Sequence, residues 1–271
     1  MVAIARIRSL HVYPVKACAG VSPDACRIDA RGLDGDRRWM VVDAAGRFLT
    51  QRTHPALARV RTRLMPDAGV TLGFAGLPDL QLRADVAERR RKVRIWNDEV
   101  DARVADAAGN DWISTVLGTA AALVLADAAT VRAPDRRWTG GLPAPVAFPD
   151  GFPVLVCSTS SLAALGRWMG TSPPMACFRP NVVIEGWTEW AEDELRELRC
   201  GEVTLRLVKP CTRCVVTTLD PSTGEPGADP LPALRSHRYD ANLKGVTFGQ
   251  NALVIAPPGA VLRVGAAVEA D

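Results

Sequence analysis

Short strand-like runs separated by glycine and proline constrain the fold of this 271-residue chain most strongly, and 22 glycines and 20 prolines interrupt it. Runs of β-branched or alternating apolar residues occupy 4–13, 70–72, 92–96, 100–104, 154–157, 182–184, 204–208, 215–219, 253–255 and 261–264. This composition and length are typical of β-strands bounded by turns. Helical spacing is restricted to 107–117, which Gly118 ends, and 162–169, which residues 158–161 can cap. The sequence predicts an α+β, mainly β fold.

The chain is long enough for two domains, each with its own core. We expect a β-rich first domain over residues 1–118, closed by the helix at 107–117, and a second domain over 119–271 that begins with a strand at 120–125. A connection rich in proline and glycine covers 133–153. It is either a plain linker or a lid over a substrate pocket, to which Trp138 and Phe148 would contribute.

Charge and composition exclude several classes of partner. The formal net charge is only +3, with 33 basic and 30 acidic residues, so a nucleic-acid partner is not expected. The basic run 89–92 has no interleaved aromatic residues and fits a solvated strand edge. There is no apolar run of the roughly 18 residues that a membrane span needs. Arginines within the first eight residues argue against a signal peptide, and seven cysteines without regular spacing indicate free thiols, so we expect a cytoplasmic protein.

Two closely spaced cysteines, Cys211 and Cys214, mark the most chemically informative segment. Arg213 lies between them and Lys209 just before them, and nearby cations favour the reactive thiolate over the thiol. Either cysteine can instead be a buried structural residue. A zinc site would need a second pair of ligands, and a thioredoxin-like pair would need a helix where residues 215–219 predict a strand. We therefore expect a reactive or metal-binding loop between two strands at the mouth of a barrel.

Five segments resemble, in order, the MOSC-domain proteins, in particular the molybdenum enzymes that reduce N-hydroxylated compounds. These segments are Tyr13–Lys16, Asp36–Trp39, Phe178–Asn181, Cys211–Cys214 with its continuation to Pro221 and Gly224, and Phe248–Asn251. The resemblance implies an N-terminal β-barrel-like domain packed on a MOSC β-barrel domain with a few helices. It also implies a molybdenum cofactor, Mo-molybdopterin, whose metal is bound by the catalytic residue Cys214.

The same resemblance assigns cofactor-binding roles, and these roles fall on Lys16, Arg37, Arg179, Asn181, Thr212, Arg213 and Asn251. Ser158 joins them because the start of a helix can hold an anion. Ala17 stands where the family often has serine, so one hydroxyl contact is missing or replaced. Arg38 is the weaker alternative to Arg37.

By resemblance, the protein reduces hydroxylamines, amidoximes and N-hydroxylated bases to amines or amidines at the cysteine-bound molybdenum. The substrate would be a small N-oxygenated molecule. The sequence has no CxxxxCxxC motif for an iron–sulfur cluster, so electrons would come from a separate protein that carries flavin or an iron–sulfur cluster. One alternative is a sulfur carrier that delivers persulfide sulfur from a MOSC cysteine for metal–sulfur cofactor assembly. Another is a binding module with structural cysteines.

Overall fold

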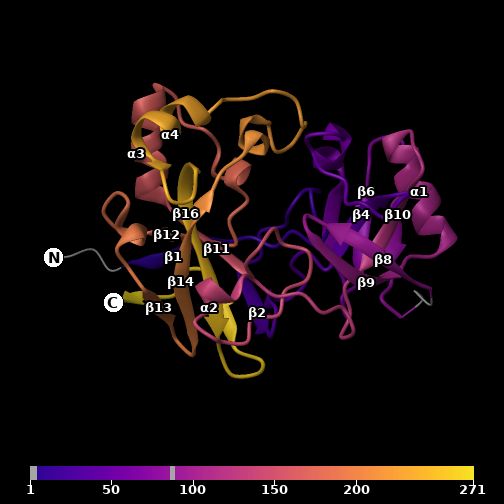
Figure 1. Cartoon of the computed structure of the whole chain (residues 1–271), viewed down its shortest axis with the longest axis horizontal. Coiled ribbons are helices and arrows are strands. Elements are labelled where there is room, and N and C mark those ends of the chain that lie inside the picture. The colour runs from indigo at the N-terminus through magenta and orange to yellow at the C-terminus, as the bar shows by residue number, and fades with distance from the viewer. Residues whose placement is uncertain (1–4, 86–88) are drawn as a thin grey trace.

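The computed structural model describes residues 5–85 and 89–271, so Ile4, the first residue of the expected strand at 4–13, lies outside the described part. Strands dominate, and four α-helices occur in the described ranges, which confirms the α+β, mainly β prediction. Figure 1 shows two β-rich parts side by side, with the C-terminus on the outer side of the larger part.

The larger part is built on an eight-stranded sheet. Along it lie β1 (Arg6–Leu10), β12 (Val182–Glu185), β11 (Val154–Ser158), β16 (Gly245–Ile255), β14 (Val203–Thr212), β13 (Glu197–Cys200) and β18 (Glu269–Ala270), with β15 (Tyr239–Asp240) paired to β16. β11 and β12 are parallel, and every other pair in this sheet is antiparallel. A core of apolar residues from these strands fills its concave side.

The smaller part contains two sheets and one helix. One sheet has the order β4 (Trp39–Asp43), β10 (Ala121–Leu125), β9 (Asp98–Val104), β8 (Arg90–Ile95), and the other β5 (Arg61–Leu64), β6 (Val70–Gly73), β7 (Leu80–Leu82). Helix α1 (Ala107–Leu117) packs on β10 and β7, and the short 3-10 helix η1 (Pro55–Arg59) packs on α1. α1 begins where Asp106 accepts a hydrogen bond from Gly109 N and ends at the left-handed Gly118, as expected.

Strands near the N-terminus of the chain pair with strands from its second half. β1 is an edge strand of the larger sheet, and β2 (Ala25–Asp29) pairs with both β3 (Gly32–Leu33) and β17 (Val261–Arg263). The segment expected to begin the second domain forms β10, a strand of the smaller part's sheet. The division of the chain after residue 118 stays a prediction.

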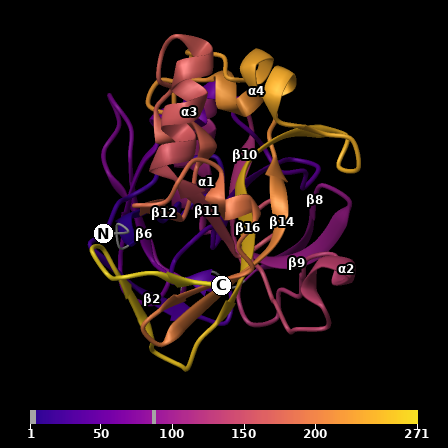
Figure 2. The same ribbon diagram turned by 90° about the vertical axis from the view of Figure 1, so that its left-hand side faces the viewer.

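Three helices belong to the larger part. α3 (Thr159–Met169) and α4 (Leu231–His237) contact each other and lie at one end of it in both views (Figures 1 and 2), and α2 (Arg136–Thr139) packs on β14. α3 begins three residues before the predicted start, with Ser158 as its N-cap residue. Two further 3-10 helices span Met175–Phe178 (η2) and Ala191–Asp193 (η3).

The prediction of a strand at 215–219 was wrong. Val215–Thr218 forms the 3-10 helix η4. The Thr217 hydroxyl donates to Cys214 O at 2.8 Å and the Thr218 hydroxyl donates to Val215 O at 2.9 Å. These local hydrogen bonds offset the extended preference of the β-branched residues.

Candidate active site

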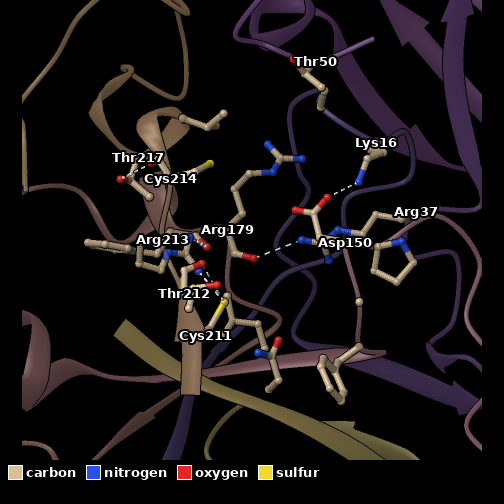
Figure 3. Close-up of a pocket in the computed structure, with 18 of the residues that line it drawn as sticks. Lys16, Arg37, Thr50, Asp150, Arg179, Cys211, Thr212, Arg213, Cys214 and Thr217 are labelled. Atoms are coloured by element: carbon tan, nitrogen blue, oxygen red, sulfur yellow. Dashed lines mark hydrogen bonds and ion pairs between the residues drawn. The ribbon is translucent and has the colours of Figure 1, made fainter. Parts of the chain in front are cut away.

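A cavity of about 390 Å³ lies between the two parts. Its wall combines residues 16–17, 50–52 and 149–152 with residues 177–179, 181, 209, 211–214 and 216–217 (Figure 3). This volume falls in the lower range of small-molecule pockets. Segments distant in sequence therefore meet at one site.

The cysteine segment enters the cavity from the end of β14. Register shifts between Leu207 and Lys209 and between Pro210 and Thr212 interrupt the pairing of β14 with β16. Bulges of this kind change the direction of a strand, and proline lacks the N–H that a regular ladder needs. Cys214 follows the strand as an exposed residue.

The cysteines divide into two groups. All seven are free. Five of them, Cys18, Cys26, Cys157, Cys177 and Cys200, are buried and pack as small apolar residues. Cys211 is partly buried and Cys214 is exposed, and both line the cavity. Cys214 is thus the most accessible thiol.

Arg213 is held beside the cysteines by its guanidinium group. Nη1 lies 2.9 Å from the Cys211 sulfur, and Nη2 donates to the carbonyl oxygen of Phe178 at 2.7 Å. Its Nε is buried and has no hydrogen-bond partner among the described residues. A buried donor without a partner costs about 1–3 kcal/mol, so an acceptor entering the cavity would relieve this cost.

Arg37 and Arg179 lie over the same aromatic ring, with guanidinium carbons 4.6 and 4.1 Å from the centroid of Tyr13. Arg37 is neutralised by Asp36 at 2.5 Å and donates to Asn181 Oδ1 at 3.2 Å. Arg179 has no such carboxylate, and its Nη2 is buried without a hydrogen-bond partner in the described structure. Burial lowers the pKa of Arg179, Tyr13 opposes the shift, and Arg37 adds to it. The pair favours an incoming anion.

Lys16 is buried and donates to Asp150 at 2.6 Å and to Phe148 O at 3.0 Å. Burial lowers the pKa of Lys16, against the opposing charge of Asp150. Partial removal from water raises the pKa of Asp150, but the charge of Lys16 and its hydrogen bond outweigh this, so the pKa lies below its usual range. Asp150 also accepts a hydrogen bond from Trp96 Nε1 at 3.0 Å.

The cavity brings together nearly all residues selected from the sequence. Its lining includes Lys16, Arg37, Arg179, Asn181, Thr212, Arg213, Cys214 and Asn251. Asn181 also supports the backbone, because Nδ2 donates to His11 O and Oδ1 accepts from Leu155 N, both at 3.1 Å.

One serine and one arginine considered from the sequence lie outside the cavity lining. Ser158 is fully buried, shares a 2.6 Å hydrogen bond with the Ser160 hydroxyl, and is outside the cavity lining. Arg38, the weaker alternative, pairs with Asp29 and is also absent from the lining.

Sequence reasoning missed several residues of the cavity wall, namely Arg52, Trp96, Asp150 and Phe152. Asp150 and Phe152 lie in the 133–153 connection that was considered as a lid, but no motif distinguished them. Trp138 and Phe148, selected for that lid, do not line the cavity, and Phe148 is fully buried in the smaller part's core.

Metal ligands are sparse in the protein itself. Within residues 5–85 and 89–271, no group of three or more histidine, cysteine or carboxylate side chains is placed to hold a metal ion. A metal bound at Cys214 would therefore take most of its ligands from a cofactor.

Comparison with known proteins defines the family. Residues 4–120 match the MOSC N-terminal beta barrel domain, and residues 143–269 match the MOSC domain. The chain belongs to the MOSC-domain family. Within this family, the chain is 30% identical to human mitochondrial amidoxime-reducing component 1, and the match covers 95% of this chain and 81% of that protein. It is also 30% identical to bovine mitochondrial amidoxime reducing component 2, covering 87% of this chain and 73% of that protein.

More distant similarities were also found. The rice molybdenum cofactor sulfurase is 27% identical over 86% of this chain but only 31% of its own length. The crystal structure of the YUAD protein from Bacillus subtilis covers 97% of this chain and 93% of its own, with 9% identity and a TM-score of 0.42.

No helix in the described ranges is long and apolar enough to cross a membrane. Relatives named as mitochondrial do not decide where this protein resides, and the cytoplasmic location stays a prediction.

Proposed function

We propose that this protein reduces N-hydroxylated compounds, including hydroxylamines, amidoximes and N-hydroxylated bases, at a molybdenum cofactor bound through Cys214. Similarity to the amidoxime-reducing components over most of both chains makes it a molybdenum-dependent oxidoreductase of the N-reductive class. The proposal adds the substrate range, the metal ligand and the cofactor-binding residues.

Charge in the cavity fits a cofactor with an anionic phosphate end. Six cationic side chains line the wall, namely Lys16, Arg37, Arg52, Arg179, Lys209 and Arg213, against the single carboxylate of Asp150. The buried Arg179 Nη2 and Arg213 Nε have no acceptor in the described structure. Phosphate oxygens are strong acceptors for guanidinium groups, so a phosphate would satisfy these donors.

The observation that carries the proposal is the exposed Cys214 thiol on the wall of this cation-rich cavity. Lys16, Arg37, Arg179 and Arg213 would hold the anionic end of the cofactor, and Cys214 would ligate its metal. Thiolate suits soft metal centres. Thr212 and Asn251 also line the cavity and would orient the cofactor's polar edges.

When bound, the cofactor supplies two-electron chemistry at an N–O bond. The overall reaction consumes two electrons and two protons, breaks the N–O bond, and releases the reduced nitrogen compound and water. Electrons would come from a separate flavin or iron–sulfur protein. The chain's own residues would hold the cofactor within the cavity, with the exposed Cys214 on its wall.

Metal analysis of Cys214→Ser beside the matched variant Cys211→Ser tests the assignment. We expect near-stoichiometric molybdenum in the wild type and in Cys211→Ser, and its loss from a folded Cys214→Ser protein. Reduction of benzamidoxime should follow the metal content. Molybdenum retained by Cys214→Ser, or absent from folded wild-type protein made in a host that produces the cofactor, would contradict the proposal.

The sulfur-carrier alternative rests on the same exposed thiol and on the similarity to a molybdenum cofactor sulfurase. It predicts a persulfide on Cys214, visible by mass spectrometry as one added sulfur atom that a thiol reductant removes. It also predicts folded protein without molybdenum.

A further inference from the structure

Two cations of the cavity wall remain after the cofactor-binding residues are assigned. Arg52 and Lys209 line the cavity, and neither forms an ion pair with a carboxylate within residues 5–85 and 89–271. They come from opposite parts of the fold, since Arg52 follows β4 and Lys209 belongs to β14. Arg52 is exposed and Lys209 is half-buried, so both cationic groups are accessible from the cavity and can meet an anionic ligand there.

Aromatic rings accompany both cations. The guanidinium carbon of Arg52 lies 5.1 Å from the ring centroid of Trp96. Lys209 Nζ lies 5.5 Å from the ring centroid of Trp138, which is outside the cavity lining, and 6.0 Å from that of Phe152. Trp96 and Phe152 line the cavity. A planar conjugated ligand can stack on such rings while its charged group meets the cations.

Trp96 is fixed although it is 43% exposed. Its Nε1 donates to Asp150 Oδ1 at 3.0 Å, and its ring packs on Phe48 with centroids 4.9 Å apart. A large aromatic side chain held rigidly at an open surface loses little entropy when a ligand binds. The indole therefore offers a preformed stacking face.

Asp150 pairs with Lys16 of the cofactor-binding group and with neither Arg52 nor Lys209 in the described structure. The same oxygen, Oδ1, accepts from Lys16 on one side and from Trp96 on the other. Lys16 thus has a carboxylate partner, whereas Arg52 and Lys209 have none in the described structure. With Lys16, Arg37, Arg179 and Arg213 assigned to the cofactor's phosphate, Arg52 and Lys209 are left to meet a second anion.

We propose that Arg52 and Lys209, with the rings of Trp96 and Phe152, form a substrate subsite for planar N-hydroxylated compounds that carry an anionic group. The inference rests on the proposed reductase function and specifies its substrate class. The shared chemistry is an oxyanion on a conjugated body, which a carboxylate or a phosphate monoester can provide.

Matched probes test this with the cofactor-loaded enzyme. One pair is benzamidoxime and 4-carboxybenzamidoxime, and the other is N4-hydroxycytidine and its 5′-monophosphate. We expect kcat/KM to be about tenfold higher for the charged member of at least one pair, the gain of one charge-assisted contact. The pair that responds identifies carboxylate or phosphate as the source. High salt should reduce the preference.

Variants separate the subsite from the rest of the cavity. Arg52→Gln and Lys209→Gln should lose about tenfold in kcat/KM for the charged probe while the neutral probe changes less than about twofold. Arg52→Lys and Lys209→Arg should retain most of the preference. Arg59→Gln is the control, because Arg59 is exposed and lies 5.1 Å over the ring of Phe74, outside the cavity lining.

Two further readouts make every outcome decisive. The first is calorimetric measurement of 4-carboxybenzamidoxime binding in the absence of turnover, which tests the subsite even if no probe is reduced. In that case, binding that depends on Arg52 and Lys209 would support the subsite while the reductase proposal fails. Molybdenum and pterin content is measured in each variant. Loss of cofactor from Arg52→Gln or Lys209→Gln, equal loss for both members of a pair, or no wild-type preference for either charged probe would overturn the inference.

Discussion

Replacement of Arg179 by methionine should stabilise the cofactor-free protein and remove its response to phosphate. Arg179 has a buried Nη2 without a hydrogen-bond partner in the described structure, and Arg37 lies over the same Tyr13 ring. Methionine retains a long flexible side chain of similar length but carries no charge. The variant therefore removes a desolvated cation that only an incoming anion would neutralise.

The magnitude follows from opposing contributions. Removing an unpaired cation recovers its desolvation penalty, which is several kcal/mol for a fully buried ion and about 1–3 kcal/mol for the half-buried Arg179. The lost contact with the Tyr13 ring, at 4.1 Å, costs about 0.5–2 kcal/mol. We expect a net gain of about 1 kcal/mol, which raises Tm by about 2–4 °C for a chain of this size.

Thermal unfolding with and without inorganic phosphate measures both effects on protein made in a host that lacks the cofactor. Phosphate at about 100 times its Kd should add about 2.7 kcal/mol to wild-type stability. The Arg179→Met protein should lose most of that increment, whereas Arg59→Met, at an exposed arginine outside the cavity lining, should keep it. A less stable Arg179→Met protein that responds to phosphate like the wild type would refute the reasoning.

Two further predictions concern stability. Gly224 has φ +76°, and a Cβ at this position would lie 2.3 Å from Pro55 O. At the control position Gly201, φ is +61° and nothing lies within 4 Å of such a Cβ. In a denaturant titration, Gly224→Ala should therefore lower the free energy of unfolding by about 1–3 kcal/mol more than Gly201→Ala. Equal costs would exclude the contact with Pro55 as the cause. Burial raises the pKa of Glu192, whose Oε1 has no hydrogen-bond partner in the described structure, so the folded state holds its proton more tightly than the unfolded state. Glu192→Gln should therefore raise Tm at pH 7.5 but leave it unchanged at a pH below 4.5, the ordinary pKa of glutamate. An equal gain in Tm at both pH values would contradict this.

The sequence predicted elements whose signals are local. The helix at 107–117 was found because its apolar spacing ends at Gly118, and the structure places both its ends as expected. The segment 215–219 was misread as a strand because β-branched composition does not reveal that the hydroxyls of Thr217 and Thr218 bond to the preceding turn.

The candidate site shows the same limit at longer range. The cofactor-binding residues taken from family motifs meet in one cavity. Ser158, selected only because a helix start can hold an anion, is outside it, and its hydroxyl bonds to Ser160. Asp150 could not be selected, because its importance depends on contacts with Lys16 and Trp96 that are far away in sequence. Such pairings arise only from the packing of the two parts against each other.

The position of β1 at the edge of the larger sheet has a consequence for synthesis on the ribosome. Arg6 pairs with Glu185, so β1 has no partner in this sheet until β12 has been translated. Pairing at such sequence separation is slow to form and leaves an apolar edge exposed meanwhile. We expect that a nascent chain arrested before β12 would be captured by chaperones, and that neither half would be recovered intact when expressed separately.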